Sequence, residues 1–264
     1  MYSVLQLGKK YLQYYFHAKN GHGHGIHSPF VFEFVDKVLL DKNKYTEFDS
    51  IEGRRAELLK DNTVIEIEDF GAGSTILPFK TRVVKDTAKV SLKNKKYSTL
   101  LFRIIKYYDL KNIVELGTSF GITTSYMARA TTGKVYTFEG AKSIAGIAVE
   151  TFKRLDIFNV NLTEGDFDQT LVSKLKEIGR VDLAFIDGNH RKKPTIDYFE
   201  LFKNSIEENG MMIFDDIHWS KEMEEAWEVI KKDSTVTLSI DLFFIGIVFF
   251  RKEFKVKQDF IIRF

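Results

Sequence analysis

The chain has 264 residues, of which 44% are hydrophobic and 29% charged, and its formal net charge is +2. This composition is typical of a soluble globular protein, and no apolar run is long enough to predict a membrane span. Cysteine is absent, which excludes disulfides, thiolate metal ligands and a cysteine nucleophile. We expect a cytoplasmic protein, because the opening residues MYSVLQLGKKYLQYYF also lack the pattern of a signal peptide.

The first 60 residues have a helical pattern. Apolar positions recur at three and four residues in VLQLGKKYLQYYF and again in FVFEFVDKVLLDK. The stretch between them, GHGHGIHSP, contains glycines and a proline that cannot continue a helix. A further amphipathic helix is expected over residues 97–109, YSTLLFRIIKYYD.

Residues 80–111 are strongly basic, with ten lysines and arginines against two acids. The simplest interpretation is a solvated helix face and loop. The alternative is a rim that attracts an acidic substrate or partner. The net charge of the whole chain is too small to indicate nucleic-acid binding by itself.

From residue 112 onward, short apolar runs alternate with helical stretches. The expected strands are NIVEL (112–116), KVYTFE (134–139), NVNLTEGD (159–166), VDLAFID (181–187), GMMIFDD (210–216), TVTLSI and LFFIGIVFFRK. Strands that alternate with helices of 10–15 residues predict a mostly parallel sheet covered on both faces. The last two runs have no helix between them and predict an antiparallel hairpin at the sheet edge. The expected fold class is a doubly wound α/β fold with seven strands.

Two glycine-rich stretches compete as the cofactor loop of this fold. EDFGAGS, residues 68–74, follows the strand-like VIEIE, whereas ELGTSFG, residues 115–121, ends the first regular strand. Lys93 stands 24 residues after Asp69, where a ribose-binding acid is needed, and RVVKDTAKVSLKNKK is too charged and irregular for a regular helix. We therefore interpret EDFGAGS as a turn, with Ser74 as a cap.

ELGTSFG lies where an open parallel sheet binds ligands, beyond the carboxyl end of a strand. Gly117 and Gly121 would let the backbone approach a ligand, and the following helix supplies N–H groups. The spacing G-x-x-x-G does not match the dinucleotide motif G-x-G-x-x-G, and the loop lacks the lysine of a phosphate loop. These features disfavour a nicotinamide, a flavin or a nucleoside triphosphate.

Acids end three successive predicted strands. Glu139 suits the two hydroxyls of a ribose, Asp166 lies in reach of an adenine edge, and Glu115 suits a cationic amino group. Together they favour an adenosine with a positively charged, unphosphorylated tail. S-adenosylmethionine is such a molecule.

The stretches VELGTSFGITTSYMA, VYTFEG, LTEGDFDQTL, DLAFIDGNH and GMMIFDDIHW carry a family resemblance. In their order and spacing, from about residue 97 to 250, they resemble class I, Rossmann-like S-adenosylmethionine-dependent methyltransferases. In particular the chain looks like the catechol and caffeoyl-CoA O-methyltransferase branch. The resemblance implies methyl transfer to a hydroxyl of a small molecule. The cofactor-binding residues that it implies are Glu115, Gly117, Thr118, Ser119, Gly121, Glu139, Gly165, Asp166 and Asp187.

Carboxylates and imidazoles follow the fourth and fifth predicted strands. The resemblance places Mg²⁺ or another divalent cation at Asp187, Asp215 and Asp216, and oxygen-rich sites of this kind suit hard cations. Asp216 stands where the family has asparagine. This departure either strengthens cation binding or marks a metal-free relative. An alternative for the two adjacent aspartates is a helix cap with a solvated neighbour.

His190 stands where the family has a catalytic lysine. A histidine can act as a general base near neutral pH, and we predict Asp187 and His190 as catalytic residues. A loop imidazole that caps a helix is the alternative. His218 and Trp219 are predicted to line the acceptor pocket, with packing beneath a loop as the alternative for the tryptophan.

The N-terminal histidines admit two interpretations. His22, His24 and His27 could bind a metal, but the surrounding glycines favour a turn. In the family, N-terminal helices often cover the acceptor side, so we expect a lid in which Gly25–Phe30 touch substrate. The predicted domains are this helical extension, residues 1–96, and a cofactor-binding domain, residues 97–264.

Two other functions stay open. A methyltransferase acting on nucleic acid or protein would use the basic 80–111 stretch, although FIDGNH stands where amine methylation of nucleic acid needs Asn-Pro-Pro-aromatic. A non-catalytic protein would keep the fold and bind the cofactor without turnover. We expect a small-molecule acceptor and no membrane or nucleic-acid partner, and leave a homodimer open.

Overall fold

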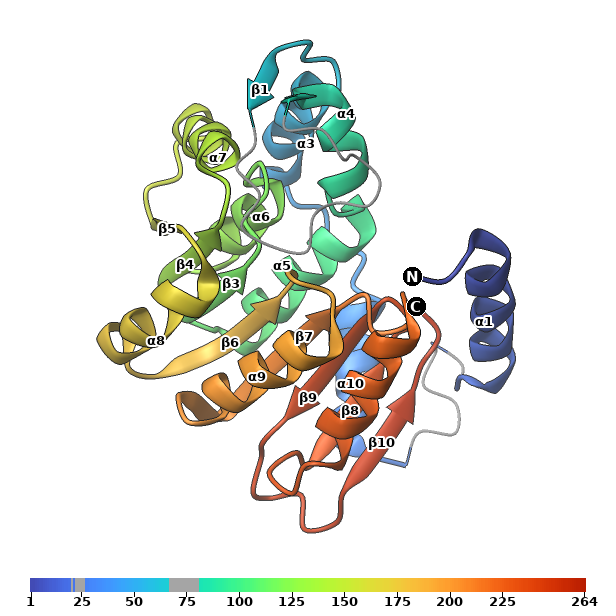
Figure 1. Ribbon diagram of the computed structural model, residues 1–264. Helices are drawn as coiled ribbons and strands as arrows, with labels where there is room; N and C mark the ends of the chain where they lie inside the picture. The colour runs from blue at the N-terminus through green and yellow to red at the C-terminus, as the bar shows by residue number, and fades with distance from the viewer. Residues whose placement is uncertain (20, 22–26, 67–80) are drawn as a thin grey trace. The chain divides into compact units, whose positions relative to one another are not determined.

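The computed structural model describes residues 1–19, 21, 27–66 and 81–264 (Figure 1). EDFGAGS with Ser74, and His22, His24 and Gly25, lie outside the described residues. The chain divides into two compact units. We call Lys42–Ile178 the middle unit and Met1–Asp41 with Gly179–Phe264 the terminal unit. The domain boundary expected at residue 96 stays a prediction.

The middle unit contains three neighbouring parallel strands in the order β3-β4-β5. Their bounds are β3 (Asn112–Leu116), β4 (Lys134–Glu139) and β5 (Val160–Glu164). The helices that follow them are α6 (Ile122–Ala130), α7 (Lys142–Arg154) and α8 (Phe167–Ile178). Ile113, Val114 and Leu116 are all fully buried, as expected for a parallel strand covered on both faces. The predicted alternation of strand and helix is confirmed here.

Before β3, the described part of the middle unit has further helices and a small hairpin. The elements are α3 (Glu47–Leu58), β1 (Val64–Glu66), β2 (Thr81–Val83), α4 (Val84–Ser91) and α5 (Lys95–Tyr108). β1 and β2 pair antiparallel. The expectation that RVVKDTAKVSLKNKK forms no regular helix is wrong. Val84, Thr87 and Ala88 share one helix face and are buried, so tertiary packing outweighs the high charge of α4.

The terminal unit contains five strands in the order β10-β8-β9-β7-β6. Their bounds are β6 (Val181–Ile186), β7 (Ile206–Asp215), β8 (Leu238–Asp241), β9 (Ile245–Phe249) and β10 (Gln258–Ile261). β6 and β7 are parallel, and β7, β9 and β8 pair antiparallel in turn. Helices α9 (Lys192–Lys203) and α10 (Lys221–Lys232) pack against each other. The expected hairpin is β8–β9.

Two strand boundaries in the terminal unit differ from the sequence prediction. β7 begins at Ile206, not at Gly210, and a register shift against β6 places Gly210 next to the carbonyl of Asp182. β10 was not predicted, and it pairs parallel with β8, so it forms the edge in place of the hairpin. It is only four residues long, which gives little periodic pattern to recognise. The two units together hold eight such strands, one more than predicted.

The N-terminal part of the terminal unit is helical, as predicted. It contains α1 (Val4–His17), α2 (Pro29–Phe34) and the π-helical turn η1 (Val35–Leu39). Ser3 and Gln6 form a capping box at the start of α1. Tyr11 and Tyr14 pack their rings against Phe243. Among the described residues, no helix is both long and apolar enough to cross a bilayer.

Gly246 in β9 provides a test of packing in the terminal unit. A Cβ at this position would lie 2.7 Å from the ring of Trp227 in α10. We expect Gly246→Ala to lower the free energy of unfolding by about 1–3 kcal/mol, because the ring or the strand must shift. Denaturant unfolding measures the change. The control is Gly8→Ala in α1, where no atom lies within 4 Å. It should leave stability unchanged or raise it by about 0.5–1 kcal/mol, and equal effects of the two variants would contradict the packing.

Candidate functional site

The loop between β3 and α6 is held by backbone contacts to β4. The N–H groups of Gly117 and Thr118 both donate to the carbonyl of Phe138, at 3.0 and 3.1 Å. Gly117 has φ 102° and Gly121 has φ 78°, values that favour glycine. A Cβ on Gly121 would also lie 2.6 Å from the ring of Phe152 in α7. Packing within the unit is therefore one reason for glycine here, besides the predicted approach of a ligand.

Glu139 ends β4 and is fixed by the same loop. Its Oε2 accepts from the N–H of Ser119 at 2.9 Å, and its Oε1 accepts from the N–H of Ala141 at 3.1 Å. Burial raises the pKa of Glu139, and backbone donors at Ala141, Ser119 and Gly140 oppose that rise. A carboxylate has about four acceptor positions. The fixed carboxylate of Glu139 thus keeps acceptor positions for the two hydroxyls of a ribose.

Glu115 lies beneath the loop and is completely buried. Its Oε2 accepts from the hydroxyls of Thr124 and Thr137, at 2.5 and 2.7 Å. Within the described part of the chain, its Oε1 has no hydrogen-bond partner. Burial raises the pKa of Glu115 to about 7, although the two threonine hydroxyls oppose the rise. Glu115 therefore joins β3, β4 and α6 from below, and any effect on a cationic ligand acts through its charge.

Gly165 and Asp166 follow β5. Gly165 has φ 118°, and its N–H donates to the carbonyl of Glu139. The side chain of Asp166 accepts from the N–H of Asp168 at 3.0 Å, at the start of α8. Asp166 therefore caps this helix. Capping occupies Oδ1 and is compatible with the predicted contact to an adenine edge through Oδ2.

In the middle unit, the structure thus gathers the predicted cofactor residues at the carboxyl ends of β3, β4 and β5. They are Glu115, Gly117, Thr118, Ser119, Gly121, Glu139, Gly165 and Asp166. Thr118 was predicted only from the family resemblance, and its hydroxyl is hydrogen-bonded to that of Thr137 at 2.6 Å. Thr124 and Thr137 were missed. Both lie inside a buried helix or strand, where a hydroxyl group needs a hydrogen-bond partner. That need is the sequence signal that could have identified them.

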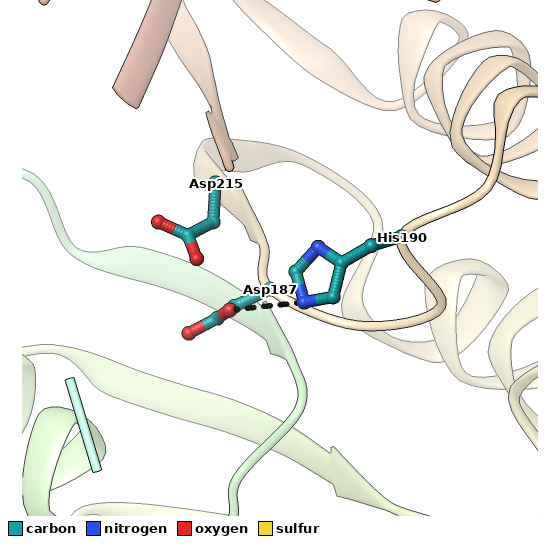
Figure 2. Close-up of side chains that lie close together, drawn as sticks. All are labelled: Asp187, His190 and Asp215. Atoms are coloured by element: carbon teal, nitrogen blue, oxygen red, sulfur yellow. Dashed lines mark ion pairs between the residues drawn. The ribbon is translucent and has the colours of Figure 1, made fainter. Parts of the chain in front are cut away.

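In the terminal unit, Asp187, His190 and Asp215 come together at the ends of β6 and β7 (Figure 2). β6 and β7 pair with Ile186 opposite Phe214, so the aspartates that follow are neighbours. One ligand atom from each of the three side chains lies within 4.8 Å of the others. His190 Nε2 is 3.7 Å from Asp187 Oδ1. The predicted catalytic pair, Asp187 and His190, thus lies together with two of the three predicted metal ligands, Asp187 and Asp215. Asp215 is almost completely buried.

The other predicted residues of this unit have different surroundings. Asp216 has φ 54°, in the left-handed region that aspartate and asparagine tolerate. It does not belong to the group of three ligand atoms. Trp219 donates its N–H to the carbonyl of Asp216, and its own carbonyl accepts from the N–H of Tyr2. The backbone of the loop after β7 is therefore bonded to the first residues of the chain.

His218 lies between two carboxylates. Its Nε2 is 2.8 Å from Asp241 Oδ2 and its Nδ1 is 3.1 Å from Glu224 Oε1. Burial by itself would lower the pKa of His218, but the hydrogen bonds and charges of Asp241 and Glu224 outweigh it and raise the pKa. The ring also stacks on Phe243. With both nitrogens engaged, His218 serves the packing of this unit, and a contact with an acceptor stays a prediction.

Glu224 connects His218 with the N-terminal helix. It accepts from the hydroxyl of Tyr2 at 2.7 Å and from Lys10 Nζ at 2.9 Å. These partners are more than 200 positions apart in the sequence, so no local pattern could have found them. Together, Tyr2, Lys10, His218, Glu224 and Asp241 form a continuous polar network in the terminal unit.

The buried carboxyl of Glu115 predicts a pH dependence of stability. The native carboxyl keeps its proton to about pH 7, above its ordinary pKa of 4.5, so the native state binds more protons than the unfolded state between these values. The free energy of unfolding should therefore fall as pH rises through this window, by about 3 kcal/mol from this group.

Glu115→Gln keeps the shape and the acceptor for the two threonines but does not titrate. We expect the stability difference between the variant and wild type to shift in favour of the variant by about 3 kcal/mol from pH 4.5 to pH 7. Denaturant unfolding across this range measures it. A difference that stays constant with pH would contradict a raised pKa at Glu115.

The network around Glu224 predicts how α1 is attached. Glu224→Gln removes the anion that Tyr2, Lys10 and His218 share, and we expect faster hydrogen exchange in α1 and a loss of about 1–3 kcal/mol. The matched control is Glu225→Gln, because Glu225 is the next residue of α10 and pairs with Lys192 at the surface. Equal exchange rates in the two variants would contradict the attachment of α1 through this network.

Comparison with known proteins agrees with the fold described above. A family model described as a methyltransferase domain matches residues 114–217. No curated protein matches the chain. The O-methyltransferase from Bacillus cereus, solved in complex with SAH, is 19% identical, with 83% of this chain and 97% of that chain covered and a TM-score of 0.54.

Two further solved structures give the same result. TomG from Streptomyces achromogenes, an O-methyltransferase of tomaymycin synthesis solved with SAM, is 15% identical, with 84% and 96% covered and a TM-score of 0.55. The SAH-bound methyltransferase PaMTH1 from Podospora anserina is 14% identical, with 81% and 100% covered and a TM-score of 0.56. At these identities the likeness establishes the fold. The chain has the doubly wound fold of these methyltransferases, and the predicted fold class is confirmed.

Proposed function

We propose that this protein transfers a methyl group from S-adenosylmethionine to a hydroxyl oxygen of a small molecule. One observation carries the proposal. Backbone N–H groups of Ser119 and Ala141 hold both carboxylate oxygens of Glu139 at the end of β4, within the segment that matches a methyltransferase domain. The three solved relatives named above are methyltransferases, and each was solved with SAM or SAH.

The middle unit would bind the cofactor without touching a phosphate. Glu139 accepts the ribose hydroxyls, and its position does not depend on a flexible side-chain partner. Asp166 lies one strand further along and offers an acceptor to the exocyclic amino group of adenine. Above about pH 7 the buried carboxyl of Glu115 loses its proton and supplies negative charge from beneath the loop. That charge favours a cofactor whose amino-acid tail carries an ammonium group and a sulfonium.

Methyl transfer from a sulfonium requires few catalytic groups on the protein, because the methyl group is already activated. The acceptor oxygen forms a bond to the methyl carbon while the sulfur–carbon bond breaks, and the sulfur leaves with the bonding electron pair as a neutral thioether. Alignment of the oxygen, methyl carbon and sulfur therefore supplies much of the rate. The remaining task is to remove the proton of the hydroxyl.

Asp187, His190 and Asp215 are suited to that task. His190 has an imidazole whose ordinary pKa is near neutrality, and Asp187 Oδ1 lies 3.7 Å from its Nε2, where its charge stabilises an imidazolium. The same three side chains fit a divalent cation, because they present two carboxylates and one imidazole nitrogen within 4.8 Å. When bound there, a cation would lower the pKa of the hydroxyl and stabilise the oxyanion.

Glu139 is the residue on which the cofactor prediction depends most. We expect Glu139→Ala to weaken S-adenosylmethionine binding at least tenfold, because two charge-assisted hydrogen bonds to the ribose are lost. Isothermal titration calorimetry measures the affinity. The control is Glu164→Ala, since Glu164 stands opposite Glu139 in the register of β4 and β5 and is exposed. The proposal is wrong if wild type does not bind the cofactor or if both variants bind it like wild type.

Cofactor binding alone does not prove catalysis. A panel of small hydroxylated acceptors with radiolabelled S-adenosylmethionine distinguishes a methyltransferase from a protein that only binds the cofactor. We expect label to appear in a small-molecule product. Label found in protein or nucleic acid, or in no acceptor at all, would favour the alternative functions.

A further inference from the structure

We propose that Asp187, His190 and Asp215 bind a first-row transition-metal ion, such as Mn²⁺ or Zn²⁺, more tightly than Mg²⁺, and that the imidazole nitrogen of His190 makes the difference. The inference rests on the proposed function only because it assigns a metal ion to the three residues that are proposed there to remove the proton of the acceptor hydroxyl. It goes further because it makes His190 a metal ligand and names the class of ion.

The donor set favours this class of ion. Mg²⁺ and Ca²⁺ bind oxygen ligands, and Mg²⁺ keeps much of its hydration. An imidazole nitrogen instead suits Mn²⁺, Fe²⁺, Co²⁺ and Zn²⁺. Two carboxylates and one imidazole balance the charge of a divalent ion. Three protein ligands also leave coordination positions for a substrate oxygen or water.

The distances fit an ion after a small adjustment. Ligand atoms about 2.1 Å from one ion lie about 3.0–3.4 Å apart, whereas His190 Nε2 and Asp187 Oδ1 are 3.7 Å apart and the whole group lies within 4.8 Å. A distance of 3.7 Å is also too long for a hydrogen bond between these two atoms. A movement of about 1 Å would therefore let both bind one ion. Figure 2 shows the carboxylate of Asp215 next to this pair.

The loop after β6 is built to turn His190 back toward Asp187. Asn189 has φ 57° and reverses the chain between the two ligands. Its side chain donates to the hydroxyl of Tyr198 at 3.2 Å and accepts from the guanidinium of Arg191 at 2.8 Å. Asp215 is the last residue of β7 and pairs with Ile245 of β9, and the preceding Phe214 pairs with Ile186 of β6. Two ligands thus come from one fixed turn and the third from a central strand.

Other histidines of the described chain do not offer this arrangement. His218 also lies near carboxylates, but its two nitrogens point at Asp241 and Glu224 on opposite sides of the ring. Asp187, His190 and Asp215 are the one group of three or more potential ligands found among the described residues. A metal bound by these residues therefore has one defined location.

The test measures ion binding directly. Purified full-length protein, stripped of metal, is titrated with MnCl₂, ZnCl₂ and MgCl₂ by calorimetry, and Mn²⁺ binding is confirmed by the loss of the free-ion paramagnetic resonance signal. All proteins carry His22→Asn, His24→Asn and His27→Asn, so that the glycine-histidine segment cannot bind the ions. We expect Mn²⁺ and Zn²⁺ to bind at least tenfold more tightly than Mg²⁺.

His190→Asn replaces the imidazole by an amide that still offers an oxygen. We expect it to weaken Mn²⁺ and Zn²⁺ binding at least tenfold and to change Mg²⁺ affinity less than about threefold. His17→Asn, on the exposed face of α1, is the matched control and should bind all three ions like its parent. Asp215→Asn should weaken binding of every ion.

The inference is wrong if Mg²⁺ binds as tightly as Mn²⁺ and Zn²⁺, if His190→Asn leaves the affinities for Mn²⁺ and Zn²⁺ unchanged, or if no ion binds. These outcomes are separable from the proposed function. Calorimetry with S-adenosylmethionine on the same proteins tests the cofactor site without reference to the metal.

Discussion

The buried carboxyl of Glu115 is the constraint on which the loop between β3 and α6 depends. It is completely buried at the end of β3 and accepts from Thr124 of α6 and Thr137 of β4. Burial of a carboxyl group with one oxygen that lacks a partner among the described residues costs free energy, and the two threonine hydrogen bonds offset part of that cost. The three elements that it joins are those that carry the loop, and the loop in turn holds Glu139. A fixed loop needs no reorganisation when a ligand arrives, which favours binding.

In the terminal unit, strand register brings the candidate site residues together. Ile186 of β6 pairs with Phe214 of β7, so the next residues, Asp187 and Asp215, become neighbours without any special loop. His190 is brought to them by the left-handed turn at Asn189. Nearby, a polar network from Tyr2 to Asp241 connects the N-terminal helix with the loop that follows Asp215. The loop that follows Asp215 and the first residues of the chain are therefore linked within one unit.

Much of this could be predicted from the sequence because the relevant signals are local. Short runs with a strand pattern end at an acid, and four of these five acids stand next to or one residue from a glycine, so the amino-acid pattern alone places Glu115, Glu139, Asp166, Asp187 and Asp215 at strand ends. The predictions failed where long-range contacts decide the outcome. α4 is a helix because one face packs, β7 starts early because of a register shift, and β10 is too short to show a period. Gly121 is required by Phe152 as well as by the loop, and a sequence pattern cannot show that.

The central claim is that the residues at the ends of β3, β4 and β5 bind the adenosine of S-adenosylmethionine. The most direct measurement is a crystal structure of the protein with S-adenosylhomocysteine. The account predicts that both ribose hydroxyls donate to the carboxylate of Glu139 and that the loop from Gly117 to Gly121 contacts the amino-acid tail. A structure in which the ligand lies elsewhere, with the carboxylate of Glu139 bonded only to Ser119 and Ala141, would contradict it.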